Sequence, residues 1–154
     1  MKYYIDCEFN GFGGELLTLA LAGEDGRDLS LSRPIDEIRH LPLVPWVRAN
    51  VLPKIDIAPV EQMPKNQFGY AIAKFLRPDL LPTIVADWPE DLKHFCDSLS
   101  VAPGEVVTMP EFRMEITHTL AYPTSLENAV RHNALWDARA LRHAANEKAI
   151  SRAG

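Results

Sequence analysis

The feature that most constrains the fold and function of this chain is a pair of carboxylates in its first apolar run. Residues 3–9 are rich in aromatic and β-branched side chains, a composition that predicts a strand. Side chains alternate along a strand, so Asp6 and Glu8 share one face, about 7 Å apart. Buried carboxylates are costly without a positive partner, and a divalent cation with oxygen ligands is a common one. The same pair also fits an edge strand with one face in water.

Length, charge and cysteine content bound the class of protein. The 154 residues predict one domain spanning 1–154, with a polar tail over 147–154 that frays. The net charge of −5 argues against a broad basic surface for duplex DNA, although bound metal ions would supply positive charge locally. Two cysteines make no disulfide framework and fit a reducing compartment, with Cys7 as a buried apolar thiol.

We expect a cytoplasmic protein that does not enter a membrane. No apolar run reaches the roughly 18 residues that a membrane-spanning helix needs. The first residues lead directly into the predicted strand and lack the pattern of a signal peptide.

The order of predicted elements indicates an α/β fold with a mixed sheet covered by helices. The expected strands lie at 2–9, 15–23, 28–32, 82–87 and within 101–116. The expected helices lie at 45–52, 66–77, 89–99, 125–130 and from Asn133 onward. The first three strands follow one another through short turns, of which Asp25-Gly26 is typical of a hairpin, so they predict an antiparallel meander.

Two later acidic positions occur where α/β folds place ligands. Asp91 falls in the first turn of a helix that follows a strand, near the strand's carboxyl end, where ligand sites form. An acidic residue there also simply stabilises a helix N-terminus. Asp137 borders the apolar stripe of the last helix, where a carboxylate needs a partner.

His132 lies just before the last helix and close in sequence to Asp137. The ordinary pKa of histidine is about 6.5, so an imidazole beside a carboxylate cluster suits a general base. A surface histidine near a helix start is the plainer interpretation of the same position.

Together these residues resemble the DEDDh exonuclease family. The likeness is carried by Asp6-x-Glu8 in the first strand, an aspartate opening the helix after the fourth strand, and His132-x-Ala134-x-x-Asp137. Within that family the chain is most similar to the RNase AS-like small exoribonucleases. The further segments that carry this likeness are 15–17, 22–27, 46–54 and 132–139.

The second motif departs from the family pattern. The family usually has Asn, then an aromatic residue, and then Asp four positions after that Asn. Here Asp87 stands in the Asn position, Glu90 in the aromatic position and Asp91 in the catalytic one. The spacing favours Asp91 as the third carboxylate, with Asp87 as the alternative.

The resemblance implies a fold and a chemistry. The fold is RNase H-like: a mixed five-stranded sheet, three antiparallel strands followed by parallel ones, flanked by helices. The implied metal ligands for two Mg²⁺ or Mn²⁺ ions are Asp6, Glu8, Asp91 and Asp137. With His132 as the general base, these residues would hydrolyse the terminal phosphodiester at the 3′ end of single-stranded RNA and release nucleoside 5′-monophosphates.

The resemblance also implies contacts with bases and with a second chain. Aromatic side chains beside the motifs are candidates for stacking on terminal bases, although each also fits a core position. These candidates are Phe9, Phe12, Trp88 and Trp136. Relatives of this kind form homodimers and prefer adenylate-containing RNA, and the sequence decides neither property for this chain.

Three other functions fit the same residues less well. A 3′–5′ DNA exonuclease of the proofreading kind would use the same centre. A non-catalytic nucleic-acid-binding protein could retain the fold, but it has no need of all four carboxylates. An endonuclease of the RNase H type does not account for His132 and its spacing.

Overall fold

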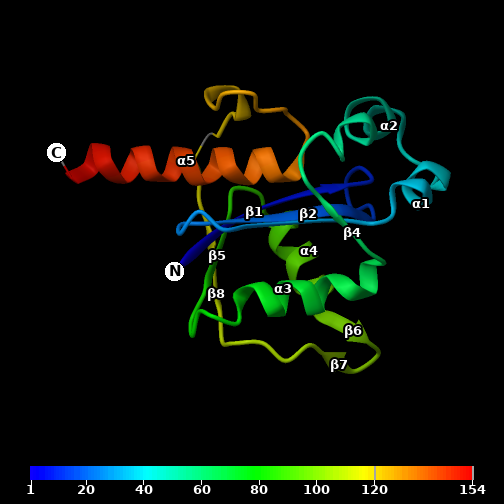
Figure 1. The fold of residues 1–154 in the computed structure, drawn as a ribbon, viewed down its shortest axis with the longest axis horizontal. Coiled ribbons are helices and arrows are strands. Elements are labelled where there is room, and N and C mark those ends of the chain that lie inside the picture. The colour runs from blue at the N-terminus through cyan, green and yellow to red at the C-terminus, as the bar shows by residue number, and fades with distance from the viewer. Residues whose placement is uncertain (120, 154) are drawn as a thin grey trace.

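The computed structural model describes residues 1–119 and 121–153 as an α/β fold built on one main sheet (Figure 1). Within these residues the sheet has six strands in the order β4-β3-β2-β1-β5-β8. Their bounds are β1 Lys2–Phe9, β2 Leu16–Gly23, β3 Asp28–Ser32, β4 Glu61–Gln62, β5 Thr83–Ala86 and β8 Arg113–Ile116. A separate ribbon pairs β6 Ser100–Ala102 with β7 Glu105–Val106.

The strand directions confirm the predicted order of antiparallel and then parallel pairing. β1, β2 and β3 form an antiparallel meander, and β5 and β8 run parallel to β1. Among the described residues the main sheet has six strands, one more than the five expected. The additional strand, β4, runs parallel to β3 inside the segment that Pro59 and Pro64 mark as a loop. Two residues between the prolines are enough for this short pairing.

Helices cover both faces of the sheet, with α5 on one face and α3 and α4 on the other (Figure 1). The helix bounds are α1 Ile35–His40, α2 Pro45–Asn50, α3 Phe68–Leu76, α4 Pro89–Leu99 and α5 Ala134–Ala153. Short 3₁₀ turns are η1 Leu52–Lys54, η2 Lys65–Gln67 and η3 Pro123–Ser125. None of the described helices is long and apolar enough to cross a membrane.

One prediction about the last third of the chain is wrong. The helix expected at 125–130 is absent from the described residues, because the chain forms only η3 and then turns through Asn128 in the left-handed region, at φ 62°. The polar segment after residue 146, for which the sequence predicts a frayed tail, continues α5 to Ala153. Alanines and lysine there favour helix even without a core beneath them. Residue 154 lies outside the described residues.

Alternation along β1 divides its side chains between two cores. Tyr3, Ile5 and Cys7 are buried on the face that α3 and α4 cover. Tyr4 is buried on the other face, against Leu141 of α5. Asp6 and Glu8 follow Tyr4 onto the α5 face, as the strand period requires.

Small side chains let α5 lie close to the sheet. Ala20 and Ala22 of β2 pack against Ala134 and Ala138 of α5. Arg139 anchors the helix further along through an ion pair of 2.7 Å with Asp28 of β3. The first turn of α5 therefore lies over the part of β1 that carries the two carboxylates.

Candidate metal centre

Three carboxylates from two elements meet on the α5 face of the sheet. One oxygen each of Asp6, Glu8 and Asp137 lies within 4.8 Å of the others. β1 contributes the first two and the first turn of α5 contributes the third. The structure thus brings together side chains that the sequence places at opposite ends of the chain.

The start of α5 holds Asp137 in place. Asn133 caps the helix, because its Oδ1 accepts a hydrogen bond of 3.3 Å from the Trp136 N–H. In return, Oδ2 of Asp137 accepts a hydrogen bond of 3.2 Å from the Asn133 N–H, in the manner of a capping box. The Asn133 amide also donates to the carbonyl of Lys54 at 2.8 Å, which ties the helix start to η1.

Asp91 approaches the same centre along the edge of β1, through the backbone of Cys7. It is 2% exposed in the first turn of α4, and its Oδ1 accepts a hydrogen bond of 3.1 Å from the Cys7 N–H. This contact places Asp91 against the backbone between Asp6 and Glu8, although it stands outside the group of three. Asp91 is therefore more than a stabiliser of its own helix.

Asp87, the alternative to Asp91, and the nearby Glu90 lie less favourably. The negative charge of Asp91 raises the pKa of Asp6 more than the charge of Asp87 does. Asp87 therefore interacts more weakly with the Asp6 carboxylate. Glu90 is used elsewhere, because its Oε1 accepts a hydrogen bond of 2.8 Å from the Gly13 N–H in the loop after β1. This geometry supports Asp91 as the third carboxylate.

Burial raises the pKa of every carboxylate in the centre. Loss of solvation is the largest cause and repulsion between the carboxylates adds to it, so the pKa of Glu8 and that of Asp91 each rise to about 8. The pKa of Asp137 rises to about 6, because backbone hydrogen bonds and Arg131 oppose the burial. The pKa of Asp6 is raised well above its ordinary value.

The donor set fits hard divalent cations. None of the four carboxylates forms an ion pair with Lys or Arg within the residues that the structure describes. Such a cluster either binds protons, as the raised pKa values indicate, or binds cations that take oxygen ligands. Mg²⁺ and Mn²⁺ are cations of that kind.

His132 lies beside this cluster in a constrained backbone. Its φ is 61°, a left-handed conformation that costs on the order of 1 kcal/mol outside glycine. It lines a small crevice together with Glu8. Burial, then Lys54 and Arg131, hold the pKa of His132 below its ordinary value, so the ring is neutral and able to accept a proton near pH 7.

Trp46 lies in a segment that carries the family likeness, but the sequence does not identify it as a neighbour of the site. Its ring meets the His132 ring edge-on, with 4.9 Å between the centroids and 83° between the planes. It belongs to α2, far from His132 in sequence, so no motif spacing could reveal the contact.

The predicted base-stacking residues differ in how open they are. Trp88 is 56% exposed just before α4, and Phe12 is 97% exposed in the loop after β1. Phe9 instead packs against His94, with 4.8 Å between ring centroids, so it serves the core. Trp136 is half-buried beneath the guanidinium of Arg139. Trp88 and Phe12 are thus the more accessible candidates.

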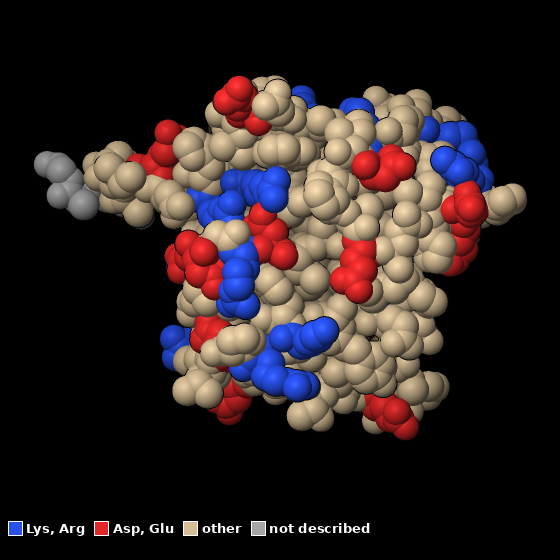
Figure 2. All heavy atoms as spheres, viewed as in Figure 1, with Lys and Arg blue, Asp and Glu red and all other residues tan. Residues whose placement is uncertain are grey.

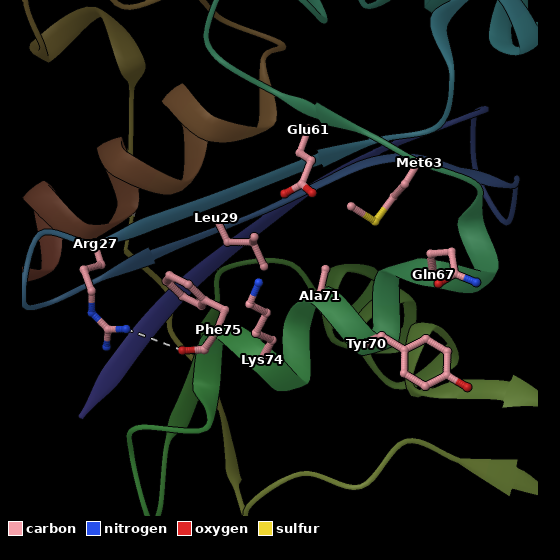
Figure 3. Close-up of a pocket in the computed structure, with 9 residues that line it drawn as sticks. All are labelled: Arg27, Leu29, Glu61, Met63, Gln67, Tyr70, Ala71, Lys74 and Phe75. Atoms are coloured by element: carbon pink, nitrogen blue, oxygen red, sulfur yellow. Dashed lines mark hydrogen bonds between the residues drawn. The ribbon is translucent and has the colours of Figure 1, made fainter.

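A separate groove of about 530 Å³ lies between β3, β4 and α3 (Figure 3). Leu29 and Phe75 line its apolar part, and Glu61 and Lys74 project into it from opposite walls (Figure 3). The groove shares no lining residue with the carboxylate centre. It is therefore distinct from the candidate site.

Charges of both signs are interspersed on the face shown in Figure 2. Arg139 and Arg142 both bind Asp28, and Arg27 binds Asp25. These arginines are largely neutralised by acidic partners, in keeping with the net charge of −5.

No protein-family model matches the chain, and a comparison with curated proteins finds no match either. Membership of the DEDDh family is therefore a hypothesis based on the residues and the geometry described above.

Proposed function

We propose that this protein is a metal-dependent 3′–5′ exonuclease that acts on single-stranded RNA. The observation that carries the proposal is the carboxylate centre of Asp6, Glu8 and Asp137, with Asp91 hydrogen-bonded to the β1 backbone at Cys7. Buried carboxylates without a cation destabilise a fold. A centre of this kind is therefore best explained by cations that bind to it.

Asp6, Glu8, Asp91 and Asp137 would hold two divalent cations, Mg²⁺ or Mn²⁺. When bound, such ions supply positive charge to a phosphodiester and acidify water. The chain's net charge of −5 is compatible with a nucleic-acid substrate on this account, because the positive charge at the phosphate comes with the metals.

The protein's own residues handle the proton and the geometry. His132 accepts a proton from the attacking water, and its lowered pKa keeps the ring unprotonated at neutral pH. Trp46 packs against the His132 ring and limits its rotation. The hydrogen bond from the Asn133 N–H to Asp137, together with the Asn133 cap, holds the Asp137 carboxylate where the first turn of α5 presents it.

Exposed aromatic rings next to the motif residues in the sequence support a single-stranded substrate. Trp88 follows β5 and Phe12 lies on the loop that Glu90 anchors, so both are close in the chain to the carboxylates. Stacking on an aromatic ring contributes roughly 1–3 kcal/mol per base and needs an unpaired strand. Attack at a 3′ end, preference for RNA and homodimer formation are further parts of the proposal that derive from the resemblance. A cytoplasmic location is a further part that derives from the cysteine content.

Matched oligonucleotides test the proposal. Single-stranded RNA and DNA of one sequence, labelled at the 5′ end, are incubated with Mg²⁺, with Mn²⁺ and with EDTA. We expect RNA to shorten from its 3′ end and EDTA to stop the reaction. Faster degradation of the DNA would favour the proofreading type of exonuclease. Binding without hydrolysis under either metal would favour a non-catalytic protein.

Variants connect the activity to the centre. Asp137→Asn should abolish hydrolysis, and His132→Ala should lower the rate by about 10²–10⁴-fold. Asp36→Asn is the matched control, because Asp36 is an exposed carboxylate of α1 paired with Arg39. Full activity in Asp137→Asn would contradict the proposed centre.

A further inference from the structure

The outer side of β3 is only partly covered by β4. Leu31 and Ser32 pair with β4, and no strand of the described residues pairs with the outer side of β3 before them. Pro59, two residues before β4, has no N–H to donate, so the pairing does not extend in that direction. The edge of β3 from Asp28 to Ser30 is therefore open.

Backbone groups point outward from this open edge. The Ser32 carbonyl accepts a hydrogen bond of 2.9 Å from the Met63 N–H, just past β4, so Ser32 faces outward. Alternate residues of β3 bond to β2, and the residues between them face the other side. Asp28 and Ser30 therefore face outward with Ser32. The Ser30 N–H and both backbone groups of Asp28 have no strand partner within the described residues.

Two grooves flank the open edge, one on each face of the sheet. The groove of Figure 3, of about 530 Å³, lies on the α3 side. A second groove of about 540 Å³ lies on the α5 side, between β3, residues 59–61 and Leu135. Leu29 and Glu61 line both grooves, so the two meet at the open edge. A strand added here would direct alternate side chains into the two grooves.

We propose that the open edge of β3 binds an extended segment of a partner protein as an added strand. Binding of this kind gains affinity from main-chain hydrogen bonds and specificity from pockets that hold alternate side chains. The edge supplies the first and the two grooves supply the second. Neither a nucleic-acid strand nor a small molecule carries N–H and C=O groups at the spacing of a strand edge. The inference does not depend on the proposed nuclease activity.

The groove of Figure 3 determines the chemistry of the bound segment. Leu29 and Phe75 form its apolar part, which fits a large apolar side chain. Lys74 and Glu61 are exposed on opposite walls (Figure 3), and neither forms an ion pair within the described residues. Arg27 also lines the groove but already has an acidic partner. We therefore expect an apolar residue with an acidic and a basic residue two positions away on either side, where strand side chains share a face.

Selected peptides test the strand pairing. A displayed library of random seven-residue peptides is selected against the full chain, and the strongest binder is synthesised. Methylation of alternate backbone nitrogens should weaken binding by about tenfold or more for one alternate set and leave it unchanged for the other, because only one side of an added strand bonds to β3. Equal effects of the two sets, or a library without a binder, would overturn the proposal.

Hydrogen exchange locates the bound peptide. At saturating peptide the amides of Asp28 and Ser30 should exchange about tenfold or more slowly, and those of Met114 and Ile116 in β8, at the opposite edge of the sheet, should not change. Protection at β8 instead would refute the assignment to β3. Protection of Asp28 and Ser30 that rises with protein concentration in the absence of peptide would show that a second copy occupies the edge, and would refute the proposed partner.

Two variants test the edge and the groove separately. Ser30→Pro removes an outward N–H and leaves the bonds between β3 and β2 intact, so it should keep the circular dichroism spectrum and weaken peptide binding by about tenfold. Lys74→Glu should also weaken binding, and a peptide with lysine in place of its acidic residue should restore it. Lys65→Glu is the control, because it makes the same charge change in η2 and lines neither groove. Wild-type affinity for the original peptide in Lys74→Glu, or in a folded Ser30→Pro variant, would contradict the proposal.

Discussion

Glu8→Gln should stabilise the metal-free protein at neutral and alkaline pH. Burial and the charges of Asp137 and Asp91 raise the pKa of Glu8 from 4.5 to about 8. Between these two values the folded protein holds a proton that the unfolded chain has lost, so stability falls as the pH rises toward 8. The glutamine cannot ionise, and it therefore does not incur this loss.

The magnitude follows from the same pKa shift. Each pH unit in the affected range is worth about 1.4 kcal/mol, so at pH 7 keeping Glu8 protonated in the folded protein costs roughly 3 kcal/mol relative to the unfolded chain, in which Glu8 is ionised. Burying the glutamine amide offsets about 1–2 kcal/mol of the gain. We expect a net stabilisation of about 1–2 kcal/mol at pH 7, or about 2–8 °C in Tm for a chain of this length.

Thermal unfolding in EDTA measures the effect. Wild type and Glu8→Gln are compared at a pH below 4.5 and near pH 8, with Glu105→Gln as an exposed control. The glutamine variant should gain its advantage only at the higher pH. Mg²⁺ should reverse the order, because the wild type has the full ligand set. A variant equal to or less stable than the wild type in EDTA at pH 8 would refute the reasoning.

Three further predictions concern the residues around the centre. Trp46→Ala should lower kcat with little change in KM and shift the pH–rate profile, because the edge-on contact with His132 limits the freedom of that ring; Trp46→Phe should retain most of the rate. Asn133→Ala should destabilise the protein by about 1 kcal/mol in urea unfolding through loss of the cap, and it should also weaken metal binding because Asp137 is released. Trp88→Ala should raise the Kd for single-stranded RNA by an amount equivalent to about 1–3 kcal/mol without changing Mg²⁺ binding, as fluorescence anisotropy would show.

The start of the fold is accessible from sequence because its signals are local. The alternation of side chains in β1 and the Asp25-Gly26 turn predict the meander and the shared face of Asp6 and Glu8. β4 was not predictable in this way, because two exposed residues between prolines have no strand pattern and pair only when β3 is already in place.

The candidate site depends on contacts that no local pattern contains. The sequence predicts which carboxylates are candidates for the site. The hydrogen bond between Asp91 and the Cys7 N–H, which distinguishes Asp91 from Asp87, is visible only in the folded structure. The packing of Trp46 on His132 likewise depends on where α2 lies. The absent helix at 125–130 has a conformational cause, since Asn128 adopts a left-handed backbone that interrupts the run.

Circular RNA tests the central claim most directly. A linear single-stranded RNA with a free 3′ end and the same RNA closed into a circle are incubated with the protein and Mg²⁺ or Mn²⁺. The account predicts that the linear form is shortened stepwise to nucleoside 5′-monophosphates, that the circle stays intact, and that EDTA stops the reaction. Cleavage of the circle, hydrolysis in EDTA, or an intact linear RNA under both metals would contradict it.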